Sequence, residues 1–224
     1  MFLTKEDEIN LKKVYSTYQN DRKGFLYYDV IRIILKFLSG KNLSIIDVGS
    51  CGIDLISDLD FKQRVSVDIE YPICSENVTG VKKDFFDYKE PHKFDIITCF
   101  QVIEHIENAK EFTQKLLNTA NLAIISLPYK WPQEQCVYHC QDPVDEKKLY
   151  SWTNKRPLFT FYVGGIYNDD RFINIYGNTK YLFKNWFDLF LLSIKYSKFS
   201  LHNNFMKSLC ENIEKLNILI QINI

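Results

Sequence analysis

The chain has 224 residues, of which 46% are hydrophobic and 25% are charged, a composition typical of a folded globular protein and not of a disordered one. Its 28 lysine and arginine residues balance 28 aspartate and glutamate residues, so the formal net charge is zero. Because proteins that bind nucleic acid usually carry a basic excess that neutralises phosphates, this balance argues against a nucleic-acid partner.

Two helices are predicted ahead of the main fold, over residues 5–18 and 28–38, where apolar residues recur at helical spacing. Residues 43–48 (LSIIDV) then form a short apolar run that leads into a glycine-containing turn, as buried parallel strands do. Further segments predict strands over residues 64–69, 79–82, 94–100 and 122–127 and an amphipathic helix over residues 109–117. Strands that alternate with helical segments are typical of a doubly wound parallel sheet.

The pattern changes in the last third of the chain. Residues 158–163 and 171–176 predict a β-hairpin that turns at Gly164 and Gly165, and helices are predicted from residue 181 onward. We therefore expect an α/β, Rossmann-like fold whose mostly parallel seven-stranded sheet ends in an antiparallel hairpin. Residues 1–224 are expected to form one domain, with N-terminal helices over residues 1–40, the core over 41–178 and a C-terminal helical segment over 179–224.

The sequence predicts no targeting or membrane-spanning segment. The N-terminal segment contains acidic residues at positions where a signal peptide needs an uninterrupted apolar core. The longest apolar run, residues 186–194, contains Asp188 and is far shorter than the roughly 20 residues that span a bilayer. We expect a cytoplasmic protein whose six scattered cysteines are reduced thiols.

The segment IIDVGSCGID, residues 45–54, predicts a ligand-binding loop after the first strand. Ligands of parallel sheets lie beyond the carboxyl ends of the strands, where Gly49 and Gly52 allow a close backbone approach and Asp47 organises hydrogen bonds. Asp68 ends the second predicted strand, and a carboxylate there can accept bonds from both hydroxyls of a ribose.

Asp84 follows the third predicted strand, where it can accept a bond from an adenine amino group while Phe85 packs on the ring. The order of glycine loop, ribose acid and adenine acid resembles class I S-adenosylmethionine-dependent methyltransferases over roughly residues 43–127. This resemblance implies S-adenosylmethionine as methyl donor, S-adenosylhomocysteine as product and methionine-end contacts at Phe100 and Gln101.

Two departures and one alternative accompany this resemblance. Cys51 and Ile53 stand where further glycines are common, and the missing third glycine also argues against a dinucleotide dehydrogenase. Alternatively, the three strand-end acids are ordinary residues that cap turns.

The segment QVIEHI, residues 101–106, follows the fourth predicted strand, where a donor methyl group and an acceptor would meet. It resembles the E-x-x-E-H motif of metal-dependent small-RNA 2′-O-methyltransferases and of ubiquinone-type O-methyltransferases. Gln101 replaces the first glutamate and is a poor ligand for a hard cation, so we expect no divalent metal. His105, with His139 as second choice, is the expected general base, and the alternative for His105 is a helix cap.

The segment of residues 126–157 is rich in aromatic and acidic side chains that suit sugar binding. Its sequence, YHCQDPVDE followed by LYSWTNKRP, resembles the corresponding segment of methyltransferases that are encoded with bacterial surface-glycan pathways. The candidate acceptor-binding residues are Tyr129, Trp131, Asp142, Asp145 and Trp152. The alternative is a folded cover over the sheet, and we do not expect zinc at Cys136, His139 and Cys140, which lack an evident fourth ligand.

The leading functional hypothesis is an O-methyltransferase that acts on a small polar acceptor, a sugar or nucleotide-activated sugar of a surface polysaccharide pathway. Two alternatives stay open: a metal-assisted RNA 2′-O-methyltransferase and a non-catalytic S-adenosylmethionine-binding module. The oligomeric state, including a homodimer, also stays open.

Overall fold

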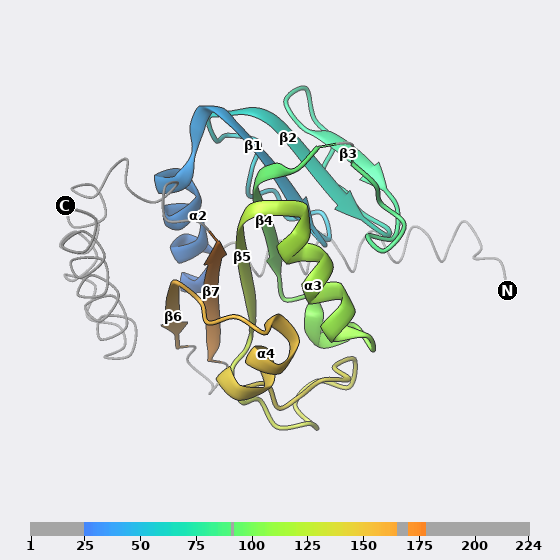
Figure 1. The fold of residues 1–224 in the computed structure, drawn as a ribbon, viewed down its shortest axis with the longest axis vertical. Helices are drawn as coiled ribbons and strands as arrows, with labels where there is room; N and C mark the ends of the chain where they lie inside the picture. Colours follow the sequence, from blue (N-terminus) through green and yellow to red (C-terminus); the bar gives the residue numbers. More distant parts are fainter. Residues whose placement is uncertain (1–24, 91, 165–169, 178–224) are drawn as a thin grey trace, which may run out of the picture.

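The structure is a computed structural model that describes residues 25–90, 92–164 and 170–177 (Figure 1). Its strands are β1 (Gly40–Val48), β2 (Phe61–Asp68), β3 (Thr79–Lys82), β4 (Phe94–Phe100), β5 (Ala120–Pro128), β6 (Phe159–Val163) and β7 (Arg171–Gly177). They form one seven-stranded sheet in the order β3-β2-β1-β4-β5-β7-β6. β7 runs antiparallel to both of its neighbours, β5 and β6. The other neighbouring pairs, β3–β2, β2–β1, β1–β4 and β4–β5, are parallel.

This architecture confirms the predicted fold class. β3 and β4 have the predicted bounds, and β1 begins three residues earlier than the predicted start at residue 43. Two short elements were not predicted, the 3-10 helix η1 (Ile103–His105) and the helix α4 (Glu146–Thr153). The predicted helices at residues 5–18 and from 181 onward, and Gly165 of the hairpin turn, lie outside the described residues.

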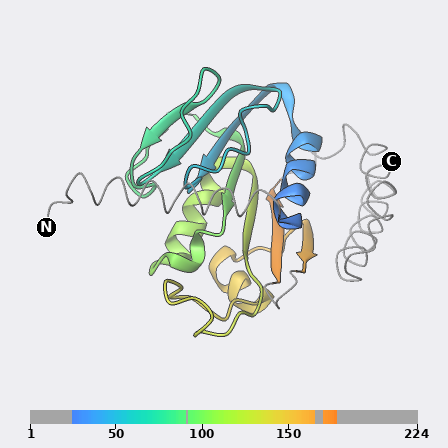
Figure 2. The ribbon, with the colours of Figure 1, turned by 180° about the vertical axis from the view of Figure 1, so that it is seen from behind.

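Helices cover the sheet on both faces, α2 (Leu26–Leu38) on one side and α3 (Ala109–Thr119) with α4 on the other (Figures 1 and 2). Successive residues of a strand point to opposite faces, and β1 follows this rule. Ile45 packs in the apolar cluster that contains Leu35 of α2, whereas Ile46 packs in the cluster that contains Leu116 of α3. Both faces of β1 are therefore buried over residues 45–48, which explains why apolar residues on both faces dominate this end of the strand.

The parallel strands leave their carboxyl ends at one edge of the sheet, and the loops that follow β1, β2, β3, β4 and β5 gather there. In α/β sheets this edge is where ligands bind. No helix in the described ranges is long and apolar enough to cross a bilayer.

Candidate functional site

A cavity of about 420 Å³ lies at the carboxyl edge of the sheet, within the usual size range of small-molecule sites. We call it the strand-end cavity. The predicted cofactor-binding residues that line it are Asp47, Gly49, Asp68, Asp84, Phe85, Phe100 and Gln101. Gly52 is not among the lining residues, and its backbone N–H donates to the carbonyl oxygen of Tyr71 at 2.8 Å.

The loop after β1 is shaped by left-handed backbone conformations. Gly49 has φ +78°, and a Cβ at this position would lie 2.3 Å from Cγ2 of Val102, so no larger residue fits. Cys51 also has a positive φ, +47°, which a residue with a side chain adopts at a cost. The cost is offset locally, because the Cys51 N–H donates to Oδ2 of Asp68 at 2.9 Å.

The Asp68 carboxylate accepts hydrogen bonds from the loops that follow β1 and β2. Besides its bond from Cys51, its Oδ1 accepts from the backbone N–H groups of Glu70 and Tyr71, both at 2.8 Å. A carboxylate offers about four lone-pair directions, so it can hold the loops and still accept from a ligand. Asp68 therefore serves the fold as well as the cavity.

Asp47 places a buried carboxylate against the cavity. Its Oδ1 accepts from the Thr98 hydroxyl at 2.6 Å, while its Oδ2 is buried and has no hydrogen-bond partner among residues 25–90, 92–164 and 170–177. Burial raises the pKa of the Asp47 carboxyl from 3.8 to about 7. An unsatisfied buried carboxylate oxygen is costly, and a cationic ligand group in the cavity would offset that cost.

Two exposed apolar side chains line the cavity beyond β2 and β3. Ile69 and Phe86 are 65% and 38% exposed, and both line the cavity. Phe85, in contrast, is buried and meets Phe112 edge to face at 5.4 Å between ring centroids. Asp84 accepts a bond at Oδ1 from the Phe86 N–H at 2.8 Å. Sequence reasoning missed Ile69 and Phe86, although each directly follows a residue that it had selected.

Three ionisable side chains gather where η1 meets the loop after β5. A carboxylate oxygen of Glu104 and one ring nitrogen each of His105 and His139 lie within 4.8 Å of one another. Glu104 is fully buried, His105 is exposed and also lines the strand-end cavity. The two imidazole rings are T-shaped at 4.7 Å between centroids. We call these three residues the histidine cluster.

Hydrogen bonds fix the tautomer of both histidines. Nδ1 of His105 lies 3.0 Å from the carbonyl oxygen of Tyr138, which only accepts, so this nitrogen carries a proton. Nδ1 of His139 lies 2.5 Å from Oδ2 of the buried Asp142 and donates to that carboxylate. In the neutral rings the lone pair is therefore on Nε2, the atom that can take a proton or ligate a metal.

Hydrogen bonds to backbone carbonyl oxygens hold the loop after β5 against η1 and the residue that follows it. The Cys140 N–H donates to the carbonyl oxygen of Glu104 at 2.9 Å, and the side-chain amide of Gln141 donates to that of Ile106 at 2.9 Å. The Trp131 ring stacks on His139 at 5.7 Å between centroids. The structure thus brings together His105, His139, Asp142 and Trp131.

The other three candidate acceptor-binding residues make contacts that hold the fold. Asp145 is the N-cap of α4 and accepts from the Lys148 N–H at 2.8 Å. Trp152 is a residue of α4, and its side chain is buried in the core. The Tyr129 hydroxyl donates to Glu146 at 2.8 Å.

Gln101 lines the cavity, but its side chain is bound to β5 and β7. Its Nε2 donates to the Ser126 hydroxyl at 3.4 Å, and its Oε1 accepts from Nε of Arg171 at 3.2 Å. Tyr27 of α2 also bonds the Ser126 hydroxyl. Sequence reasoning missed Tyr27, Ser126 and Arg171, because nothing in the local pattern indicates that residues 25 to 99 positions apart meet here.

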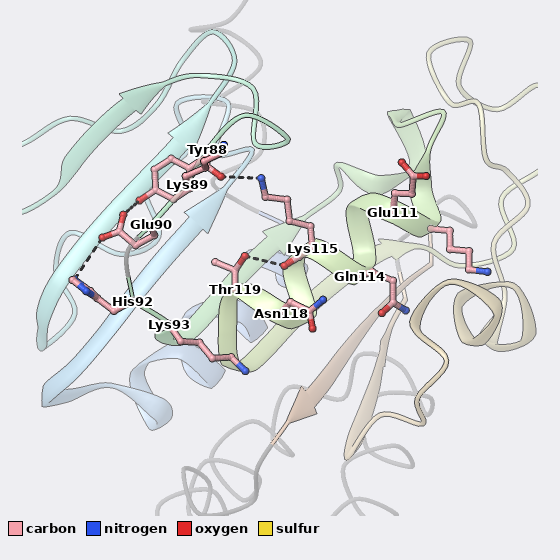
Figure 3. Close-up of a pocket in the computed structure, with 11 residues that line it drawn as sticks. Tyr88, Lys89, Glu90, His92, Lys93, Glu111, Gln114, Lys115, Asn118 and Thr119 are labelled. Carbon is pink, nitrogen blue, oxygen red and sulfur yellow. Dashed lines mark hydrogen bonds and ion pairs between the residues drawn. The ribbon is translucent and has the colours of Figure 1, made fainter.

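A second cavity of about 980 Å³ lies between α3 and the segment before β4 (Figure 3). One of its two lysines on α3, Lys115, donates to the carbonyl oxygens of Phe86 and Tyr88 at 2.7 and 2.8 Å. Desolvation by burial lowers the pKa of Lys115. The described residues that line this cavity include no glycine, and its histidine, His92, is exposed and lies 3.8 Å from Glu90. Lys115 holds the turn that carries Asp84.

No family model matches the sequence, and no curated protein matches it. Solved structures with a similar fold include the N-methyltransferase NodS from Bradyrhizobium japonicum WM9 in complex with S-adenosyl-L-homocysteine, with TM-score 0.55 and 10% identity over 66% of this chain and 84% of that chain. An S-adenosylmethionine-dependent methyltransferase from Clostridium acetobutylicum ATCC 824 has TM-score 0.54 and 12% identity over 75% and 99%. The methyltransferase domain of bacterial CtHen1-CN has TM-score 0.51 and 16% identity over 68% and 97%. At these identities the similarity establishes the fold.

Proposed function

We propose that this chain is an S-adenosylmethionine-dependent O-methyltransferase that acts on a hydroxyl of a small polar acceptor, a sugar or a nucleotide-activated sugar. The observation that carries the proposal is that His105 belongs both to the strand-end cavity and to the histidine cluster. A methyl donor bound in the cavity would therefore lie beside the proton acceptor of the cluster, because His105 belongs to both. The similar fold of methyltransferases of known structure supports the proposal.

The lining of the cavity fits the three chemical parts of the donor. The buried Oδ2 of Asp47 suits the donor's ammonium group, and Asp68 suits the ribose hydroxyls. The exposed apolar side chains of Ile69 and Phe86 suit the adenine ring, with Asp84 beside them. When bound, S-adenosylmethionine supplies a methyl group activated by its sulfonium.

The histidine cluster supplies the proton acceptor. A hydroxyl that attacks a methyl carbon becomes acidic as the bond forms, and an imidazole Nε2 can take its proton. Asp142 holds His139 in the required tautomer and stabilises the imidazolium that results, as the carboxylate of a catalytic triad does. Trp131, stacked on His139, supplies an aromatic ring beside the cluster, against whose edge a sugar would pack.

Replacing Asp68 with alanine is expected to weaken S-adenosylhomocysteine binding by about 1–3 kcal/mol, because a charged acceptor for two hydroxyls is lost. The melting temperature should fall as well, since three backbone N–H groups lose the same acceptor. Calorimetry and thermal melting measure the two effects, with Asp60→Ala as an exposed control. An unchanged dissociation constant in the folded variant would remove Asp68 from the donor site.

A second candidate function, metal-assisted RNA 2′-O-methylation, is favoured by one observation. Two imidazoles and a carboxylate within 4.8 Å form a donor set that suits a transition metal. Glu104, His105 and His139 would hold such an ion, which would supply a Lewis acid beside the acceptor oxygen. Gln101 would not join them, because its side chain is bound to Ser126 and Arg171.

Exhaustive dialysis against EDTA is expected to leave the rate of methyl transfer to nucleotide sugars unchanged, because proton transfer to a histidine needs no metal. The measurement is the rate before and after dialysis, with elemental analysis of the dialysed protein. A loss of turnover that Mg²⁺ or Mn²⁺ restores would contradict the histidine-base proposal. It would favour the metal-assisted candidate, which a salt-dependent RNA gel shift would then test.

A further inference from the structure

Gln101 occupies a strained backbone position in the wall of the strand-end cavity. Its φ is +56°, in the left-handed region that residues with a Cβ adopt only at a cost in free energy. It directly follows β4 and lines the cavity together with Phe100 and Val102. Such strain persists only where the surroundings hold the residue in place.

Both ends of the Gln101 side chain and its backbone are held. The backbone N–H donates to the carbonyl oxygen of Ser126 at 3.1 Å, and the side-chain Nε2 donates to the Ser126 hydroxyl. Oε1 accepts from Nε of Arg171 at 3.2 Å. The amide plane of the side chain is therefore fixed between β5 and the first residue of β7.

Arg171 is in turn fixed by two aromatic rings from other elements. Its guanidinium lies 5.3 Å from the ring centroid of Tyr27 on α2 and 5.2 Å from that of Trp131. Both distances are within the range of cation–π attraction. Trp131 stacks on His139, so Arg171 connects the wall of the strand-end cavity to the loop that carries the histidine.

We propose that Arg171 is a positioning residue of the donor site, which acts by holding Gln101 in its left-handed conformation. This inference rests on the proposed function, because it takes the strand-end cavity to be the site of S-adenosylmethionine. The first residue of β7, which does not itself line the cavity, thus controls the shape of a wall that follows β4. Removing Arg171 would let Gln101 relax to a negative φ and displace the backbone beside the bound donor.

The test is S-adenosylhomocysteine calorimetry in a double-mutant cycle of Arg171→Leu and Gln101→Gly. Arg171→Leu is expected to weaken binding about tenfold in the wild-type background, the size of a left-handed strain penalty. Glycine adopts a positive φ without strain, so Arg171→Leu should weaken binding less than about twofold in the Gln101→Gly background. Arg32→Leu, which removes an exposed ion pair on α2, is the matched control.

Gln101→Ala provides an independent arm in which Arg171 is intact. Alanine keeps the strain and loses the side-chain bonds, so this variant should bind about tenfold more weakly than Gln101→Gly. An equal loss from Arg171→Leu in both backgrounds, or equal affinities of the alanine and glycine variants, would overturn the inference. Absence of binding by the wild type would instead overturn the proposed function, and with it this role of Arg171.

Discussion

Replacing His139 with glutamine is expected to lower kcat by about 10²–10⁴-fold, the usual contribution of a general base. Affinity for S-adenosylhomocysteine should stay nearly intact, because His139 is not among the residues that line the strand-end cavity. Glutamine approximates the shape of the ring but offers no basic nitrogen. The measurement is the rate of methyl transfer at saturating donor, with product detected by mass spectrometry.

Companion variants separate the roles within the histidine cluster. His105→Gln tests the other candidate base, and Asp142→Asn tests the carboxylate that orients His139. His92→Gln, which changes an exposed histidine beside Glu90, is the control. If neither His105 nor His139 costs more than about tenfold in kcat, roughly 1.4 kcal/mol of barrier, the histidine-base mechanism fails. A loss of donor affinity instead of kcat would indicate a structural role.

Replacing Asp47 with asparagine is expected to weaken S-adenosylhomocysteine binding at pH 8 by about 1.5–3 kcal/mol, the worth of a charged hydrogen bond. The pKa of Asp47 is about 7, so its carboxylate is charged at pH 8 and largely neutral at pH 6. Wild-type affinity for the ammonium-bearing ligand should therefore rise from pH 6 to pH 8. The affinity of Asp47→Asn should not change over this range, which calorimetry at both values would establish.

The same substitution is expected to stabilise the ligand-free protein at pH 8. The folded-state pKa of Asp47 lies above the ordinary carboxyl value of 3.8, so the folded state binds the proton more tightly than the unfolded state. The free energy of unfolding must then decrease as pH rises from about 4 to about 7. Asparagine keeps an acceptor for Thr98 and removes this cost, so thermal melting at pH 8 should give a higher Tm. Asp58→Asn is the exposed control, and a lower Tm for Asp47→Asn would contradict the account.

Asp47→Asn is thus expected to lower ligand affinity and to raise stability, as is typical of a ligand site built from a buried charge. Oδ2 of Asp47 is buried without a hydrogen-bond partner in the described part of the chain, and a cationic ligand would provide one. Asp68 differs, because its carboxylate is already held by three backbone N–H groups. Its replacement should reduce both stability and affinity, so the two acids are distinguishable by melting alone.

The strand-end residues could be predicted from the sequence because the physics of a parallel sheet is local. A short apolar run marks each strand, and the residues at its end or just after it must lie near the carboxyl edge, which located Asp47, Asp68 and Asp84. The same reasoning located Gln101 and His105 after β4. Their common place in one cavity follows from the strand order alone.

The loop after β5 could be predicted only in part, because its contacts are tertiary. His139 and Asp142 were both selected, but their spacing did not reveal that one orients the other. Asp145 was selected for its carboxylate, although it precedes an eight-residue helix and caps it. Arg171 looked like an ordinary strand residue, since its partner Gln101 is distant in sequence.

Calorimetric titration of the wild-type protein with S-adenosylhomocysteine tests whether the strand-end cavity is the methyl-donor site. We expect saturable binding at one site per chain, stronger at pH 8 than at pH 6 and weakened by Asp47→Asn and Asp68→Ala. The Asp58→Asn control should bind like the wild type. Absence of saturable binding by the folded wild-type protein, or binding that neither substitution weakens, would contradict the assignment of the strand-end cavity as the methyl-donor site.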